Sequence, residues 1–152
     1  MIDKIKLCEF EDKFEKKVKE FLLEICVNEF GFSSWKEELE SQNINSYKEN
    51  GGNFWVAMDD EEEIIGTIAL KNLGEKKGLL KSMYVNNKYR GSKLAQKLLN
   101  ILISEAINNN YNIIELETLL QLERAIGFYK KNDFYLKHQD GDVMVFEKKL
   151  VV

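Results

Sequence analysis

The chain has 152 residues, 44% of them hydrophobic and 11% aromatic, which fits one compact domain with a buried core. Its 26 acidic residues outnumber its 22 lysines and arginines, and the net charge of −4 argues against nucleic acid as the main partner. Two cysteines and one histidine, at no metal-ligand spacing, argue against a disulfide framework and against a metal site.

The first third of the chain predicts a strand and two helices. Residues 3–10 alternate between polar and apolar side chains, which is typical of a strand. The period changes at Asp12, and six apolar residues then share one helical face up to a stop at Gly31: Phe14, Val18, Phe21, Leu22, Ile25 and Cys26. A second, more polar helix is predicted over residues 34–48.

The middle of the chain predicts three strands. The glycine-rich segment 48–54 indicates a loop. Strand-like runs follow at residues 54–59, 63–72 and 78–85. The acidic segment 59–63 separates the first two runs and is most simply a solvated hairpin tip.

The last third alternates between helix and strand. Residues 92–109 separate into an apolar and a polar face at 3.6 residues per turn, which predicts a long helix. A strand over residues 112–118 and a short helix over residues 120–132 follow. The tail, residues 133–152, reads as two strands joined at Asp140-Gly141.

The predicted order of elements is therefore βααβββαβαββ. The strand–helix–strand unit in the second half needs a crossover connection, so the fourth and fifth strands should be parallel neighbours. The hairpins elsewhere make the sheet mixed, and the fold class is α/β.

The chain shows no targeting segment and no internal boundary. Its first 17 residues are charged throughout and lack the apolar core of a signal peptide, and no run is long enough to span a membrane. We therefore expect a cytoplasmic protein without a membrane partner, folded as a single domain over residues 1–152. Monomer and homodimer both remain open.

The turn Arg90-Gly91-Ser92, between the fourth strand and the long helix, admits two interpretations. It is only a tight connection, or its backbone amides hold an anion. The first amides of a helix lack internal acceptors and carry partial positive charge. Glycine lets a ligand approach the backbone, and arginine forms charge-assisted contacts with phosphate. The turn alone favours the plain connection.

Two motifs reverse that preference. Residues 90–95 (RGSKLA) resemble the Arg/Gln-x-x-Gly-x-Gly/Ala motif of the GNAT acyltransferase superfamily, and residues 125–134 (AIGFYKKNDF) resemble its later Ala-x-x-Phe/Leu-Tyr run. The resemblance implies a three-layer αβα fold with a mixed sheet of six to seven strands, in which strands four and five splay apart. It also implies acetyl-CoA as cosubstrate and a small-molecule or peptide amine as acceptor.

The resemblance assigns the cosubstrate to two segments. The diphosphate would rest on the amides that open the long helix, and the pantetheine arm would pair with the fourth strand. Lys93 stands where the family has its second glycine, and we expect its side chain to point outward and add a cation rather than crowd the diphosphate. Asp133 replaces another glycine, at a turn whose left-handed backbone aspartate tolerates. The implied binding residues are Met83, Tyr84, Val85, Arg90, Gly91, Ser92, Lys93, Leu94, Ala95, Gln96 and Phe128.

The same resemblance suggests catalytic groups. Tyr129 would protonate the departing thiolate, since a phenol of pKa near ~10 can donate to a thiolate whose thiol has a pKa near ~8.5; the alternative is an aromatic that only packs. A backbone N–H near Val85 would polarise the thioester carbonyl. The family's usual glutamate is replaced here by Leu79, which leaves Glu117 as the candidate base, or else as an exposed or structural carboxylate.

The acceptor is not identified by the sequence. Phe32, Trp35 and Trp55 are candidates for its pocket, although core packing is favoured for Trp55. The acidic segment 59–63 would attract a cationic acceptor such as a polyamine. We expect an N-acetyltransferase that moves an acetyl group from acetyl-CoA to a primary amine; the alternative is a catalytically silent acyl-CoA-binding regulatory module.

Overall fold

One mixed β-sheet of seven strands runs through the protein. The computed structural model describes residues 4–150. The strands are β1 (Lys6–Glu9), β2 (Asn53–Met58), β3 (Ile64–Gly74), β4 (Lys77–Val85), β5 (Ile113–Leu119), β6 (Tyr135–Asp140) and β7 (Val143–Lys149). They stand side by side in the order β1-β2-β3-β4-β5-β7-β6. The pair β4–β5 is parallel and the other neighbouring pairs are antiparallel, which confirms the mixed sheet.

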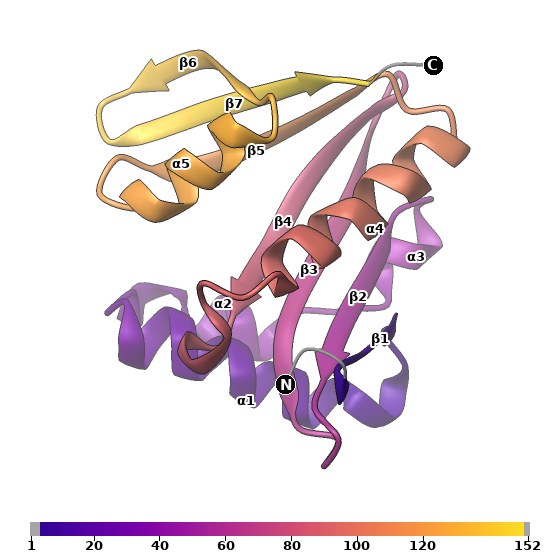
Figure 1. Cartoon of the computed structure of the whole chain (residues 1–152), viewed down its shortest axis with the longest axis vertical. Coiled ribbons are helices and arrows are strands. Elements are labelled where there is room, and N and C mark those ends of the chain that lie inside the picture. Colours follow the sequence, from indigo (N-terminus) through magenta and orange to yellow (C-terminus); the bar gives the residue numbers. More distant parts are fainter. Residues whose placement is uncertain (1–3, 151–152) are drawn as a thin grey trace.

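Helices cover both faces of this sheet, which confirms the three-layer arrangement (Figure 1). The helices are α1 (Glu15–Leu23), its π-helical continuation η3 (Glu24–Glu29), α2 (Lys36–Ser41), α3 (Ser46–Glu49), α4 (Leu94–Asn108) and α5 (Glu123–Lys131). Short 3₁₀ turns are η2 (Asp12–Phe14), η4 (Ser33–Trp35) and η5 (Asn87–Tyr89). One buried cluster packs α4 and α5 on the sheet, and a second packs α1, η3 and α3 on it.

The single helix predicted over residues 34–48 is wrong. The chain forms η4 and α2, and its backbone then becomes extended at Gln42 (ψ 133°). A new helix, α3, begins after this break. Trp35, Leu39 and Ile44 are not spaced at one helical period, so one straight helix could not bury all three. The break changes the phase of the chain and brings Ile44 and Tyr47 into the core.

The strand β4 carries a bulge that separates it from β5. Thr67 of β3 lies opposite Tyr84, and Ala69 lies opposite Lys81, so that two residues of β4 face one of β3. The bulged Ser82 has φ +52°, and its carbonyl accepts a hydrogen bond of 2.7 Å from the Thr67 hydroxyl. Pairing of β4 with β5 is confined to the stretch from Lys77 to Leu79, and beyond it the two strands diverge (Figure 1). The expected splay is confirmed.

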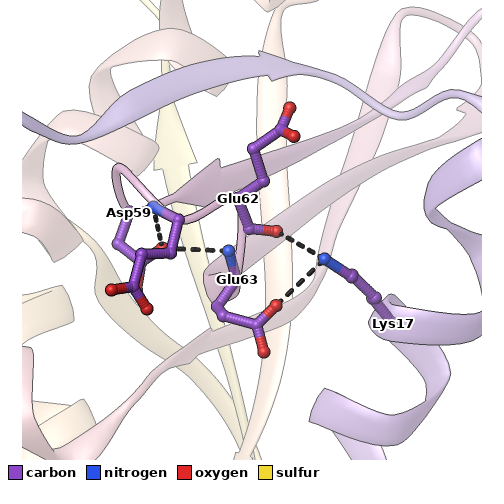
Figure 2. Close-up of polar contacts among 5 residues, drawn as sticks. Lys17, Asp59, Glu62 and Glu63 are labelled. Atoms are coloured by element: carbon purple, nitrogen blue, oxygen red, sulfur yellow. Dashed lines mark hydrogen bonds and ion pairs between the residues drawn. The ribbon is translucent and has the colours of Figure 1, made fainter.

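The acidic segment 59–63 is the tip of the β2–β3 hairpin, as predicted, and it is tied to α1 (Figure 2). The Asp59 carboxylate accepts the backbone N–H of Glu61 and of Glu63, both at 2.9 Å. Lys17 Nζ donates to the carbonyl of Glu62 (3.0 Å) and to the Glu63 carboxylate (2.9 Å), and the Glu63 hydrogen bond raises the pKa of Lys17. The lysine thereby fixes Glu62 in its left-handed conformation (φ 62°).

Candidate active site

A cavity of about 1210 Å³ lies where β4 and β5 separate, between the start of α4 and the helix α5. It is lined by all of the residues that the sequence assigned to cofactor binding and catalysis except Leu94. The Leu94 side chain is fully buried in the core beneath α4, so only its backbone belongs to this region. The fold thus brings the two family motifs to opposite walls of one cavity.

The start of α4 presents unpaired backbone donors to this cavity. Within residues 4–150, the N–H groups of Gly91, Lys93, Ala95 and Gln96 have no internal acceptor, whereas the N–H of Leu94 donates to Ser92 Oγ at 3.2 Å. Gly91 has φ +85°, a conformation that glycine adopts without strain. Four free donors at the positive end of a 15-residue helix suit an anion such as a diphosphate.

Lys93 adds a cation beside these donors. Its backbone (φ −88°, ψ 9°) stands just before the first residue of α4, so the helix begins two residues later than predicted. The side chain is exposed and belongs to the cavity lining. This placement agrees with an ammonium group near a bound anion.

The backbone of β4 faces the gap at alternate residues. The N–H of Asn86 donates to the Ile65 carbonyl at 2.9 Å, and Tyr84 lies opposite Thr67, so these residues pair with β3. On an antiparallel strand alternate residues direct their backbone groups to the same neighbour. Met83 and Val85 therefore direct theirs to the side from which β5 diverges, where an extended ligand could pair with them.

The Arg90 side chain is bonded to Glu29 and to the backbone of Val85. Its guanidinium forms a forked ion pair with both carboxylate oxygens of Glu29, at the end of η3, with 3.0 Å between Nη2 and Oε1. Its Nε donates to the Val85 carbonyl at 3.1 Å, and the group lies 5.6 Å from the centre of the Phe30 ring. Nothing in the sequence pointed to Glu29, which is 61 residues away from its partner.

Tyr129 presents its hydroxyl group to β4. The ring is buried, 5.8 Å from the Phe128 ring and 5.7 Å from the Phe134 ring between centroids, and the hydroxyl donates to the Met83 sulfur at 3.7 Å. Burial raises the pKa of Tyr129 well above its usual value, so the phenol stays protonated at neutral pH. Tyr129 therefore both packs and offers a proton. Asp133, on the turn after α5, has the expected left-handed backbone (φ 69°).

A second cavity, of about 730 Å³, opens beside the first. Its lining includes Glu38, Lys71 and several hydroxyl and amide side chains from α2, α3 and the residues that follow each of these helices. The two cavities share six lining residues: Trp35, Leu80, Lys81, Ser82, Tyr84 and Glu117. Glu117 is exposed on β5, at the opening between the cavities. Lys81 lines the same opening from β4, although no pattern in the sequence indicates it.

The three aromatic residues predicted for the acceptor pocket lie in different places. Trp35 lines both cavities, and Phe32 packs against it with 4.4 Å between ring centroids. Trp55 is 4% exposed and belongs to the core, as favoured from the sequence. The acidic hairpin tip, residues 59–63, lines neither cavity. Burial also raises the pKa of Tyr84, whose hydroxyl meets the buried Cys26 thiol on the α1 side of the sheet.

The model of the acetyltransferase (GNAT) family matches residues 18–134. This range includes both motifs and all residues that line the first cavity except Val143. The chain belongs to this family. The spermidine N(1)-acetyltransferase of Thermoplasma acidophilum is 31% identical to this GNAT acetyltransferase over 116 residues, which make up 75% of this chain and 70% of the relative.

Solved GNAT structures share the whole fold. An acetyltransferase of the GNAT family from Staphylococcus aureus is 30% identical, with a TM-score of 0.87 over 97% of this chain and 99% of that one. The PaiA N-acetyltransferase of Thermoplasma acidophilum, solved in complex with coenzyme A, has a TM-score of 0.84 at 22% identity, over 95% of this chain and 98% of that one. The second likeness shows the fold alone.

No helix in residues 4–150 has the length and hydropathy to cross a membrane. The same residues contain no group of three or more histidine, cysteine, aspartate or glutamate side chains that could hold a metal ion.

Proposed function

We propose that this GNAT acetyltransferase transfers the acetyl group of acetyl-CoA to a primary amine of a small molecule. The proposal rests on one observation: four free amides at the start of α4 and the unpaired edge of β4 line the same cavity. A diphosphate and an amide-rich arm need these two surfaces next to each other. Acetyl-CoA supplies the activated acyl group.

The binding residues divide between its two ends. The amides of Gly91, Lys93, Ala95 and Gln96 hold the diphosphate, and the Lys93 ammonium adds a charge-assisted contact. Ser92 keeps this turn closed through the Leu94 N–H. The backbone of Met83 pairs with the pantetheine arm, which leaves the Val85 N–H for the thioester carbonyl, while the Tyr84 and Phe128 side chains line the walls.

The reaction forms a bond from the amine nitrogen to the acyl carbon and breaks the carbon–sulfur bond. The Val85 N–H donates to the carbonyl oxygen as negative charge grows on it. Tyr129 gives its phenolic proton to the departing sulfur and recovers a proton from solvent. Glu117, at the opening between the cavities, accepts the proton that the amine must lose.

The acceptor enters through the second cavity. Glu38 and Glu117 provide two carboxylates there, and Lys71 and Lys81 provide two ammonium groups. The similarity to a spermidine acetyltransferase favours a polyamine as the first acceptor to test, since carboxylates can pair with a second ammonium group. A panel of spermidine, simple monoamines and amino acids, with thiol release from acetyl-CoA as the readout, compares these classes. Binding of acetyl-CoA without thiol release for any amine would instead support a silent regulatory module.

Acetyl-CoA should raise the melting temperature of the wild-type protein, because a ligand that binds only the folded state stabilises it. Gly91→Glu should abolish this shift by placing a negative charge among the amides. Gly74→Glu is the matched control: Gly74 also has a positive φ (+86°) and open space around it, but it lies on the β3–β4 turn outside the cavity. Equal shifts in the two variants would contradict the assigned diphosphate site.

A further inference from the structure

The Arg90 side chain joins three elements around the first cavity. It bonds to the end of β4 through the Val85 carbonyl, to the end of η3 through Glu29, and it covers Phe30. The side chains of Arg90 and Glu29 are 25% and 31% exposed, so this ion pair is partly shielded from water. Arg90 itself belongs to the loop that leads into α4.

The π-helical turn explains why Glu29 reaches this loop. The N–H of Phe30 donates to the carbonyl of Ile25, five residues earlier, at 2.9 Å. Each π turn contains more residues than an α turn, so the residues after it point in a new direction. Ile25 and Cys26 stay in the core, while Glu29 and Phe30 turn toward Arg90.

A direct contact between the diphosphate and the guanidinium N–H groups that bind Glu29 and Val85 would break this arrangement. The guanidinium would have to leave Glu29, and a partly shielded carboxylate would lose its only ion-pair partner within residues 4–150. It would also release the Val85 carbonyl at the end of β4. The anion already has four amides and the Lys93 ammonium available without this change.

We infer that Arg90 is a positioning residue: paired with Glu29, it sets the relative placement of the α4 amides and the β4 edge instead of binding phosphate itself. The inference rests on the proposed function. It adds Glu29, which precedes Arg90 by 61 residues in the chain, to the residues that determine affinity for the acyl donor. It also connects the donor site to the end of η3, since Phe30, the residue that follows η3, lines the first cavity.

Glu29→Gln separates the two roles of Arg90 by the sign of its effect. A positioning pair predicts weaker coenzyme A binding, by about tenfold in Kd, because the loop loses its anchor. A phosphate-binding arginine predicts tighter binding, since the variant removes a competing carboxylate. The matched control is Glu24→Gln on the same π-helical turn, and it should leave Kd unchanged. Among the described residues, 4–150, the Glu24 carboxylate accepts a hydrogen bond only from Asn28 (2.8 Å).

Arg90→Lys provides a second test that keeps the charge. Lysine loses the forked geometry, so a positioning role predicts a loss of affinity similar to that of Glu29→Gln, with no further loss in the double variant. The dependence of Kd on salt should keep the wild-type slope, because no phosphate contact is lost. Full affinity in Arg90→Lys, or additive effects with a smaller salt slope, would overturn the inference. Wild-type protein that binds no coenzyme A would refute the proposed function itself.

Discussion

Tyr129 combines packing and chemistry in one side chain, since its ring is buried between two phenylalanines while its hydroxyl reaches Met83 in the cavity wall. The sequence left these two interpretations as alternatives, and the geometry is compatible with both at once. Because burial raises the pKa of this phenol, the group remains a proton donor at the pH where a released thiolate needs one.

Removing the hydroxyl should therefore affect turnover more than stability. Tyr129→Phe keeps the ring and loses one weak hydrogen bond to sulfur, so the melting temperature should change little. The rate of thiol release at saturating acetyl-CoA should fall by about 10²–10⁴-fold, the range of a general acid. Kd for coenzyme A, measured by calorimetry, should stay near the wild-type value. An unchanged rate would leave Tyr129 with packing alone.

Alkaline pH should destabilise the protein through its buried tyrosines. Burial raises the pKa of Tyr129 and of Tyr84, so the folded state keeps both protons where unfolded tyrosine, of pKa near ~10, releases its own. The unfolded state then binds fewer protons, and the free energy of unfolding falls as pH rises above ~10, by up to about 1.4 kcal/mol per pH unit for each group. Below that pH neither group contributes to the slope.

Urea unfolding between pH ~9 and pH ~11 measures this slope. In Tyr129→Phe the slope should be shallower, because one buried phenol with a raised pKa is gone. A slope identical to that of the wild type would mean that the phenol ionises equally in the folded and unfolded states.

At the level of elements, the bulge of β4 creates the gap on which the donor site depends. The Thr67 side chain is fully buried and donates to the carbonyl of the bulged Ser82 at 2.7 Å. This hydrogen bond stabilises a backbone conformation (φ +52°) that serine rarely adopts. The shape of the cavity thus depends on a side chain of the neighbouring strand.

Thr67→Val should weaken both the fold and donor binding. Valine has the shape of threonine but leaves the Ser82 carbonyl without this donor, which should lower the free energy of unfolding by about 1–2 kcal/mol. Kd for coenzyme A should rise in parallel, as the Met83 and Val85 backbone loses its position. Thr67→Ser retains the hydroxyl and should keep the wild-type Kd even where the lost methyl group lowers stability. Equal Kd values in all three proteins would show that the bulge persists without this bond.

At the level of the whole molecule, the sequence predicted what is encoded locally. Strands and the long helix follow from side-chain periods, and the walls of the first cavity follow from two motifs that are each continuous in the chain. The interrupted helix at residues 42–45 and the π-helical turn of η3 were not predictable, because both depend on how side chains reach the core. Lys81 and Glu29 were missed for a related reason. Lys81 lines a cavity formed with distant segments, and Glu29 contacts Arg90 from 61 residues away, so no local sequence pattern identifies either residue.

A chain of alternating charges crosses the sheet where β4 and β5 still pair. Lys77 of β4 meets Glu115 of β5 at 3.1 Å, and Lys137 of β6 bridges Glu115 (3.3 Å) and Glu147 of β7 (3.2 Å). These ion pairs add side-chain contacts between strands at the end where β4 and β5 are hydrogen-bonded, whereas the cavity lies at the end where the two strands diverge. The Tyr135 hydroxyl and Lys137 hold the pKa of Glu147 below its usual value, so the Lys137–Glu147 pair between β6 and β7 persists in mild acid and is lost as pH falls through that lowered pKa.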